Sequence, residues 1–206
     1  MFCFAPGEML LCVVGPGAGE ETRPGERRLC FIWYRHVPRA ELAGLFTDAS
    51  GREHDLSIPP PLIRAEVVRE LKAHAAEVLP PLIVPVVHAV AQPLLQAISD
   101  MESPRMAFGR IALAGDAAFV VRPHVAGGAG KAAMDAACLA ERLCEASDVA
   151  SALVDYERQQ LDFGQRIVRH SRTLGAELES RRSARDLARI IRDYGAPNIV
   201  HAVADK

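Results

Sequence analysis

The sequence is poor in aromatic residues and carries almost no net charge. Aromatic side chains make up 5% of the 206 residues, and 24 basic residues nearly balance 26 acidic ones. Single strands of nucleic acid are usually bound by aromatic stacking platforms in a basic groove, and duplexes by an excess of Lys and Arg. The composition therefore argues against a nucleic-acid partner.

Paired cysteines, membrane spans and a secretory signal are also missing. The five cysteines never form a Cys-x-x-Cys pair, so neither a zinc site nor a disulfide framework is indicated, and we expect buried thiols in a reducing compartment. No apolar run approaches the roughly 18 residues that a membrane span needs. The start of the chain has no basic region, and Pro6, Gly7 and Glu8 interrupt its apolar residues. We expect a cytoplasmic protein with no metal and no membrane partner.

The first half of the chain has the character of strands and short helices. Two runs rich in apolar or β-branched residues, 9–14 and 28–37, indicate strands that could pair as a hairpin across a glycine-rich connection. The other elements expected here are a short helix at residues 40–46, an amphipathic helix at residues 64–79 and a strand at residues 94–98. Residues 82–91 are apolar, and the secondary structure that they form is ambiguous from the sequence.

After residue 104 the pattern changes to one strand followed by helices. Residues 110–114 indicate a short buried strand, and small residues then open a helix at about residues 126–145. Ser147 or Asp148 could cap a second helix that runs to about Leu174. A last helix is expected at residues 183–193. We therefore predict an α/β chain with one domain over residues 1–104 and another over residues 105–206.

Two glycine-rich stretches resemble nucleotide-binding loops without matching them. A dinucleotide fingerprint over residues 15–20 would need glycine at position 20, where the chain has Glu20. A P-loop ending at Lys131 would need glycine at position 125 and a hydroxyl group at position 132, where the chain has Val125 and Ala132. We therefore expect a turn at the first stretch and no NTPase site at the second.

Residues 109–139 carry the strongest functional signal. A strand delivers Asp116 at its C-terminal end, where open α/β sheets bind ligands, and the carboxylate can accept hydrogen bonds from a polyol. Pro123 fixes the following loop. Three glycines then allow a planar ligand to approach the backbone beside helix N-terminal N–H groups, namely Gly127, Gly128 and Gly130. A strand–turn–helix packed through small residues is the alternative explanation for each piece taken alone.

Taken together, the pieces resemble the second flavin-binding motif of the class A flavoprotein monooxygenases, the para-hydroxybenzoate hydroxylase-like family. The matching residues are Gly115-Asp116-Ala117-Ala118, Pro123, the turn at residues 126–130, and Asp135-Ala136 with Leu139. The resemblance implies FAD as cofactor and NAD(P)H as co-substrate. It also implies that Gly115 and Asp116 bind the ribityl side, that Pro123 lies against the isoalloxazine, and that the glycine turn faces its pyrimidine edge.

The motif departs from the family pattern in two places. Phe119 stands where the family usually has histidine, and the turn lacks the two amide side chains of Gly-Gln-Gly-x-Asn. The run Arg122-Pro123-His124, together with Phe31-Ile32-Trp33-Tyr34-Arg35 upstream, is most similar to the 2,6-dihydroxypyridine 3-hydroxylase branch. Arg122 and His124 are the candidate catalytic or substrate-contacting residues. A salt-bridged arginine and a solvent-facing histidine are the alternatives, and the sequence leaves both open.

The resemblance covers only the C-terminal half of a complete family member. The strand–Gly-x-Gly-x-x-Gly–helix that holds the ADP part of FAD, and a further Asp-Gly segment, do not occur in the sequence. The implied fold is part of the substrate-domain β-sheet, followed by the last strand and C-terminal helices of a Rossmann-like FAD domain. The edge of residues 110–114 would then be exposed.

Two hypotheses follow from this partial resemblance. In the first, the chain is a fragment or split subunit of a hydroxylase that acts on an electron-rich, hydroxylated aromatic or N-heteroaromatic ring. Its partners would be a small aromatic substrate and a complementary N-terminal half, and its C-terminal helices could form a homodimer contact. In the second, the chain is a non-catalytic interaction module that keeps the substrate-domain surface.

Overall fold

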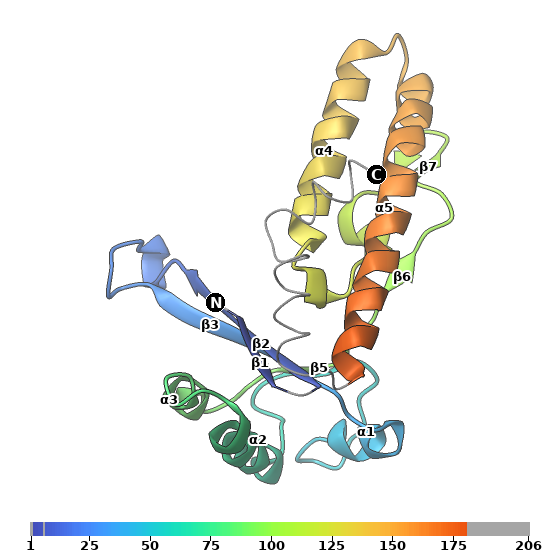
Figure 1. Ribbon diagram of the computed structural model, residues 1–206. Helices are drawn as coiled ribbons and strands as arrows, with labels where there is room; N and C mark the ends of the chain where they lie inside the picture. The colour runs from blue at the N-terminus through green and yellow to red at the C-terminus, as the bar shows by residue number, and fades with distance from the viewer. Residues whose placement is uncertain (1, 6, 181–206) are drawn as a thin grey trace. The chain divides into compact units, whose positions relative to one another are not determined.

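The structure, a computed structural model, describes residues 2–5 and 7–180 (Figure 1). The chain divides into two compact units, which we describe separately: among the described residues, unit 1 comprises residues 2–5, 7–97 and 178–180, and unit 2 comprises residues 98–177. The domain assignment to residues 1–104 and 105–206 stays a prediction. The helix expected at residues 183–193 lies outside the described residues. None of the described helices is long and apolar enough to cross a membrane.

Unit 1 is built on an antiparallel sheet with the strand order β1-β2-β3. The strands are β1 (Phe2–Ala5), β2 (Glu8–Gly15) and β3 (Arg28–Arg35). Glu8 lies opposite Arg35 in the register, so the predicted hairpin of β2 and β3 is confirmed. In the connection, a Cβ on Gly17 would lie 1.9 Å from the carbonyl oxygen of Glu26, so only glycine fits there.

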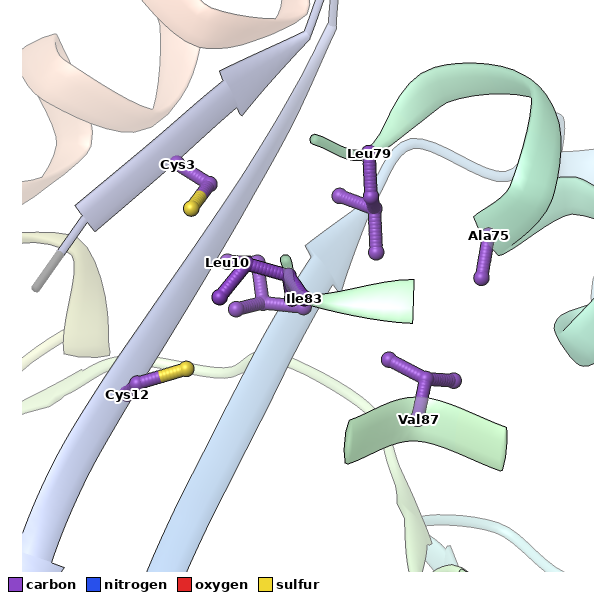
Figure 2. Packing of buried hydrophobic residues seen from close by; sticks show 7 residues of the cluster. All are labelled: Cys3, Leu10, Cys12, Ala75, Leu79, Ile83 and Val87. Carbon is purple, nitrogen blue, oxygen red and sulfur yellow. The ribbon is translucent and has the colours of Figure 1, made fainter. Parts of the chain in front are cut away.

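One face of this sheet packs against two helices and forms the core of unit 1 (Figure 2). The helices are α2 (Ala65–Val78), which confirms the predicted amphipathic helix, and α3 (Val84–Ala89), which lies within the ambiguous residues 82–91. The buried cluster consists of Cys3, Leu10, Cys12, Ala75, Leu79, Ile83 and Val87. Side chains alternate between the faces of a strand, so Leu10 and Cys12 point to the same side. Burial of a leucine such as Leu10 contributes about 1.5–3 kcal/mol.

The remaining elements of unit 1 are short. Helix α1 (Arg39–Leu45) follows Pro38 and confirms the predicted short helix. The strand expected at residues 94–98 is present only as β5 (Leu95–Gln96), which pairs with β4 (Ser57–Ile58).

The cysteines are only partly as predicted. Cys3, Cys12 and Cys138 are buried free thiols, whereas Cys30 and Cys144 are exposed, so the expectation of buried thiols is wrong for these last two. Burial raises the pKa of the Cys3 and Cys12 thiols. Cys30 is exposed because it lies on the opposite side of the sheet from the helix-covered face, one position from Phe31.

The described strands of unit 2 are two residues long. They form two antiparallel pairs: β6 (Met101–Glu102) with β9 (Phe119–Val120), and β7 (Ala107–Phe108) with β8 (Ile111–Ala112). The strand predicted at residues 110–114 is therefore shorter than expected, and its description as buried is wrong. Ile111 is 66% exposed, because Gly109, with a φ of +64°, turns β7 into β8 as an isolated hairpin.

Two long helices supply most of the packing in unit 2. Helix α4 (Gly128–Glu145) begins slightly later than predicted, because Ala126 adopts a left-handed conformation with a φ of +50°. Helix α5 (Val149–Glu179) extends beyond the predicted end near Leu174. Asp148 is the cap, since its Oδ1 accepts a hydrogen bond of 3.0 Å from the Ser151 N–H. Apolar residues of α5 that recur at multiples of three to four positions are buried, among them Leu153, Tyr156, Phe163 and Ile167.

Candidate functional site

The centre of the predicted site is a single turn of 3-10 helix, η2 (Gly115–Ala117). Gly115 is buried with a φ of +57°, a left-handed conformation that favours glycine. A Cβ at this position would also lie only 3.2 Å from the Cβ of Ala132 on α4. Asp116, the next residue, is exposed. The turn therefore packs its glycine against the helix and leaves its carboxylate accessible.

A buried ion pair on α4 forms hydrogen bonds with the backbone of this turn. The Asp135 carboxylate oxygen Oδ2 accepts a hydrogen bond of 2.8 Å from the Gly115 N–H and another of 2.5 Å from the Lys131 ammonium. The exposed fraction of the side chain is 1% for Lys131 and 0% for Asp135. In the sequence, Lys131 stands out only as the lysine of a possible P-loop, and the chain does not match that pattern. The signal that could have found the pair is the i, i+4 spacing of opposite charges on a helix.

Phe119, at the position of the family's histidine, is part of the core. Its side chain is fully buried, and the Lys131 ammonium lies 4.6 Å from the centre of its ring. On α5, a Cβ at Gly164 would lie 2.4 Å from the ring, so that glycine makes room for it. The departure from the family pattern is therefore accommodated by a buried cluster in which Phe119 packs with Cys138 of α4 and with Tyr156 and Val168 of α5.

The predicted proline loop forms a second short 3-10 helix, η3 (Pro123–Val125). The Pro123 carbonyl accepts a hydrogen bond of 2.9 Å from the Ala126 N–H and closes the turn. Ala126 takes the left-handed conformation at the first position of the predicted glycine turn, a strained conformation that costs a non-glycine residue roughly 1 kcal/mol. Pro123 itself is half-buried.

The predicted glycine turn is in fact the entry to α4. Gly127 is buried, and a Cβ there would lie 3.0 Å from the Cδ1 of Ile167 on α5. Gly128 and Gly130 belong to the first turn of the helix, as the helix predicted at about residues 126–145 requires, and not to a separate turn as the motif implies. At Gly128 a Cβ would meet no atom within 4 Å. Gly127 is thus needed for packing, and Gly128 keeps the backbone open.

Arg122 takes part in an ion-pair network, as the salt-bridge alternative requires. Its Nε donates a hydrogen bond of 2.6 Å to Asp100 Oδ2. Arg172 on α5 binds the other oxygen of Asp100, at 2.5 Å, and also binds Glu102. Hydrogen bonds from Arg172 and then Arg122 hold the pKa of the Asp100 carboxyl below its usual range. No local pattern in the sequence indicates this network, because its members lie far apart along the chain.

His124 is half-buried. The alternative explanation of a solvent-facing histidine is therefore not met in full. A Cβ at Gly175 on α5 would lie 3.3–3.4 Å from the imidazole of His124 and 3.1 Å from Nη1 of Arg122. The lack of a side chain at Gly175 therefore lets both candidate residues lie close to α5.

In unit 1, a polar cluster that sequence reasoning missed lies beside β3. Glu8 accepts hydrogen bonds of 3.0 Å from the indole N–H of Trp33 and 2.7 Å from the imidazole of His74. The rings of Trp33 and His74 stack with their centres 5.6 Å apart, and Arg35 lies over the indole. This cluster fixes α2 on the sheet through its contact with His74.

The residues around η2 fit a ligand with a polyol chain and a flat ring, such as the flavin half of FAD. Asp116 offers exposed acceptors for hydroxyl groups. The N-terminus of α4 has no side-chain cap, so its first N–H groups are not occupied by one. Ala129 and Gly130 are exposed and small, which leaves the start of the helix accessible to an electron-rich ring edge.

Two family models match this chain. The FAD binding domain model matches residues 61–171, and the FAD binding domain-like model matches residues 1–100. The first of these includes η2, η3, α4 and most of α5.

Individual relatives agree with these matches. The 2,6-dihydroxypyridine 3-monooxygenase of Paenarthrobacter nicotinovorans is 30% identical over 165 residues, which cover 80% of this chain and 41% of that protein. The structure of 2,6-dihydroxypyridine-3-hydroxylase from Arthrobacter nicotinovorans is 27% identical with a TM-score of 0.75, covering 86% of this chain and 44% of that one. The structure of HpxO from Klebsiella pneumoniae, complexed with FAD and uric acid, matches with a TM-score of 0.64 and covers 99% of this chain and 46% of that one. Its 19% identity shows a shared fold alone.

These comparisons confirm several predictions made from the sequence. They confirm the resemblance to the FAD-dependent aromatic hydroxylases, its dihydroxypyridine branch, the α/β fold class and FAD as the cofactor of the family. The chain spans 41–46% of the length of the relatives named above. The roles of Gly115, Asp116, Pro123 and the α4 glycines remain predictions.

Proposed function

This chain belongs to the FAD-binding domain family, and we propose that it provides the C-terminal half of a FAD-dependent monooxygenase. The proposed reaction is hydroxylation of an electron-rich, hydroxylated aromatic or N-heteroaromatic ring with NAD(P)H and O₂. The dihydroxypyridine hydroxylases among its relatives favour a dihydroxypyridine-like substrate. A reducing, cytoplasmic location is part of the same proposal.

The observation that carries the proposal is the geometry of η2. Gly115 is fixed by a buried carboxylate, while Asp116, directly after it, presents its own carboxylate to the outside. An exposed acidic group on a rigid turn suits a ligand with several hydroxyl groups, because two carboxylate oxygens can accept up to about four hydrogen bonds. The ribityl chain of FAD is such a ligand.

The residues around η2 have distinct roles in this proposal. Asp116 orients the polyol, Pro123 stiffens the loop beside the ring, and the N–H groups at the start of α4 stabilise electron density at the ring edge. Arg122 and His124 are the proposed substrate contacts. Because Asp100 already pairs with Arg122, we expect Arg122 to position the loop as well.

FAD, when bound, supplies the oxidative chemistry, which no protein side chain can provide alone. The protein's contribution is to bind the ring, orient it and exclude water. A complementary half, on the same polypeptide or on another, would bind the pyrophosphate, for which these 206 residues hold no Gly-x-Gly-x-x-Gly pattern. A homodimer through the C-terminal helices is a further proposal.

The first test is a titration of the full chain with FAD, followed by quenching of flavin fluorescence. Asp116→Ala should raise the Kd roughly 10- to 100-fold, because hydrogen bonds to a charged acceptor are lost. Asp162→Ala is the matched control, since Asp162 is an exposed aspartate of the same unit, paired only with Arg166 in the described contacts. Its Kd should stay within about twofold of the original.

The outcome separates binding from catalysis. Equal affinities for the Asp116→Ala and Asp162→Ala variants would remove Asp116 from the site and with it the basis of the proposal. If the chain binds FAD as expected, oxidation of NAD(P)H should be stimulated by dihydroxypyridines once a complementary half is added. A complete assembly that shows no such stimulation would contradict the proposed reaction.

A further inference from the structure

The Lys131–Asp135 pair has no role in the proposed chemistry, although it is the most deeply buried ion pair among the described residues. Removing two charges from water is costly, and apolar side chains of similar size commonly stabilise a fold at least as well. What apolar side chains cannot do is accept a hydrogen bond from a backbone N–H group. The contacts of Asp135 therefore indicate what the pair does.

Asp135 uses one oxygen for both of its contacts. Oδ2 accepts the Gly115 N–H at 2.8 Å and the Lys131 ammonium at 2.5 Å, whereas Oδ1 has no hydrogen-bond partner among the described residues. Lys131 thus neutralises and orients the carboxylate that faces η2. The ammonium also lies 3.5 Å from the carbonyl oxygen of Gly115, so it approaches the same residue from its other side.

Gly115 depends on a partner from outside the local backbone. It follows β8, which ends at Ala112, so no strand ladder is available to its N–H group. The residue is buried, and a buried N–H group without an acceptor is strongly unfavourable. Its carbonyl oxygen accepts the Ala118 N–H at 3.1 Å. Asp135 therefore completes the hydrogen bonding of a left-handed residue that directly precedes Asp116.

We propose that Lys131 and Asp135 are positioning residues for the flavin site, which fix the direction of the Asp116 carboxylate through the backbone of Gly115. The pair does not touch the ligand. Its contribution is to keep η2 in one conformation before the ligand binds, so that ordering of the turn does not oppose binding. The assignment of FAD as the ligand rests on the proposed function, but the control of the turn does not.

The test compares two charge-free double variants of the full chain. K131M/D135N removes both charges and keeps an acceptor for the Gly115 N–H, whereas K131M/D135L removes the charges and the acceptor. D162L/R166M, a surface ion pair with the same i, i+4 spacing on α5, is the matched control. For each variant we would measure amide hydrogen exchange at Gly115 and at Leu79 of unit 1, and the Kd for FAD.

If the pair positions the turn, Gly115 should exchange roughly tenfold or more faster in K131M/D135L than in K131M/D135N, because only the leucine leaves its N–H group without a partner. Exchange at Leu79 should be the same in both. The Kd for FAD should be about tenfold or more weaker in K131M/D135L than in K131M/D135N. The control should stay within about twofold of the original chain.

Equal exchange at Gly115 in the two double variants would overturn the proposal, whatever the result with FAD. Faster exchange with equal FAD affinity would also overturn it, because the turn would then not position the ligand. Should the original chain bind no FAD, the proposed function of the isolated chain fails, and the exchange at Gly115 alone decides whether the pair holds the turn.

Discussion

Unit 1 and unit 2 hold their backbones in place by different means. In unit 1, β2 and β3 are each eight residues long and pair with each other over their whole length. In unit 2, the described strands are two residues long, and side chains from α4 and α5 reach across to loop backbone instead. These contacts are Glu157 to the N–H groups of Met106 and Ala107, Tyr156 to the carbonyl of Leu113, Asp135 to Gly115, and Ser171 to Arg122.

The difference shows how a binding loop can be rigid without a sheet. Backbone groups that find no strand partner must be satisfied by other polar groups when they are buried. In unit 2 the helices provide these groups, and each is buried or half-buried where it meets the loop. We therefore expect the stability of unit 1 to depend mainly on apolar burial, and that of unit 2 on a few polar contacts.

The largest effect is expected from Lys131→Met in unit 2. This change leaves the Asp135 carboxylate buried without a countercharge, and should lower the free energy of unfolding by about 3–5 kcal/mol. Urea unfolding followed by far-UV circular dichroism would measure the loss. Arg158→Met, which breaks an exposed ion pair with Asp155, should cost only about 0–1 kcal/mol. Similar losses for the two variants would refute the importance of the buried pair.

A somewhat smaller effect is expected from Leu10→Ala in unit 1. Leu10 is completely buried between the sheet and its helices (Figure 2), and the cavity should cost about 3 kcal/mol. The single tryptophan of the chain, Trp33, packs against this core, so its fluorescence reports the unfolding of unit 1. Leu29→Ala makes the same change at a half-exposed position of β3 and should cost less than about 1 kcal/mol. A loss as large for Leu29→Ala would contradict an apolar origin of this stability.

The smallest effect, and the one that depends on pH, is expected from Glu157→Gln. Hydrogen bonds from the N–H groups of Ala107 and Met106 lower the pKa of Glu157, against the effect of its burial. A carboxylate whose pKa is lower in the folded state stabilises the fold above its unfolded pKa, about 4.3, and loses this contribution as the pH falls through the folded value. At neutral pH the variant should be about 1–2 kcal/mol less stable than the original chain.

Below the folded pKa of Glu157 this difference should disappear, since the original chain then carries a protonated side chain at that position. Unfolding by urea at several values between pH 7 and pH 3, roughly spanning the titration of a carboxyl group, would follow the change. Glu141→Gln, at an exposed position of α4, is the control and should show no comparable dependence on pH. A constant difference across the range would mean that the charge of Glu157 does not matter.

The sequence predicted unit 1 better than unit 2 for a physical reason. Long strands and amphipathic helices leave a periodic pattern, which located β2, β3 and α2 correctly. The two-residue strands of unit 2 are too short to leave one. The apolar run at residues 110–114 predicts a buried strand, whereas Ile111 is exposed. For the glycine run before Lys131, the family motif implies a turn, whereas the small residues predict the start of a helix, and the helix begins at Gly128.

In the candidate site, too, residues of a local pattern are predicted from the sequence and contacts between distant residues are not. Gly115, Asp116 and Pro123 were found because they belong to a local motif with fixed spacing, and the comparisons confirm the family that this motif predicts. The sequence also identifies Arg122 and His124 as candidate residues, but it does not predict which residues they contact. Asp100 lies 22 residues before Arg122, and no local pattern relates the two.

By itself, the sequence determined the family, the chemical character of the turn at Asp116 and the main helices, because each of these depends on residues that are close together along the chain. Only the tertiary structure decided which charges are buried and what they hold. Neither the motif that contains Asp135 nor the charge of Lys131 indicates that both side chains are buried, where they contact Gly115 and Phe119. Burial and hydrogen-bond partners arise from segments that are distant along the chain, and these are the properties that turn a motif into a positioned site.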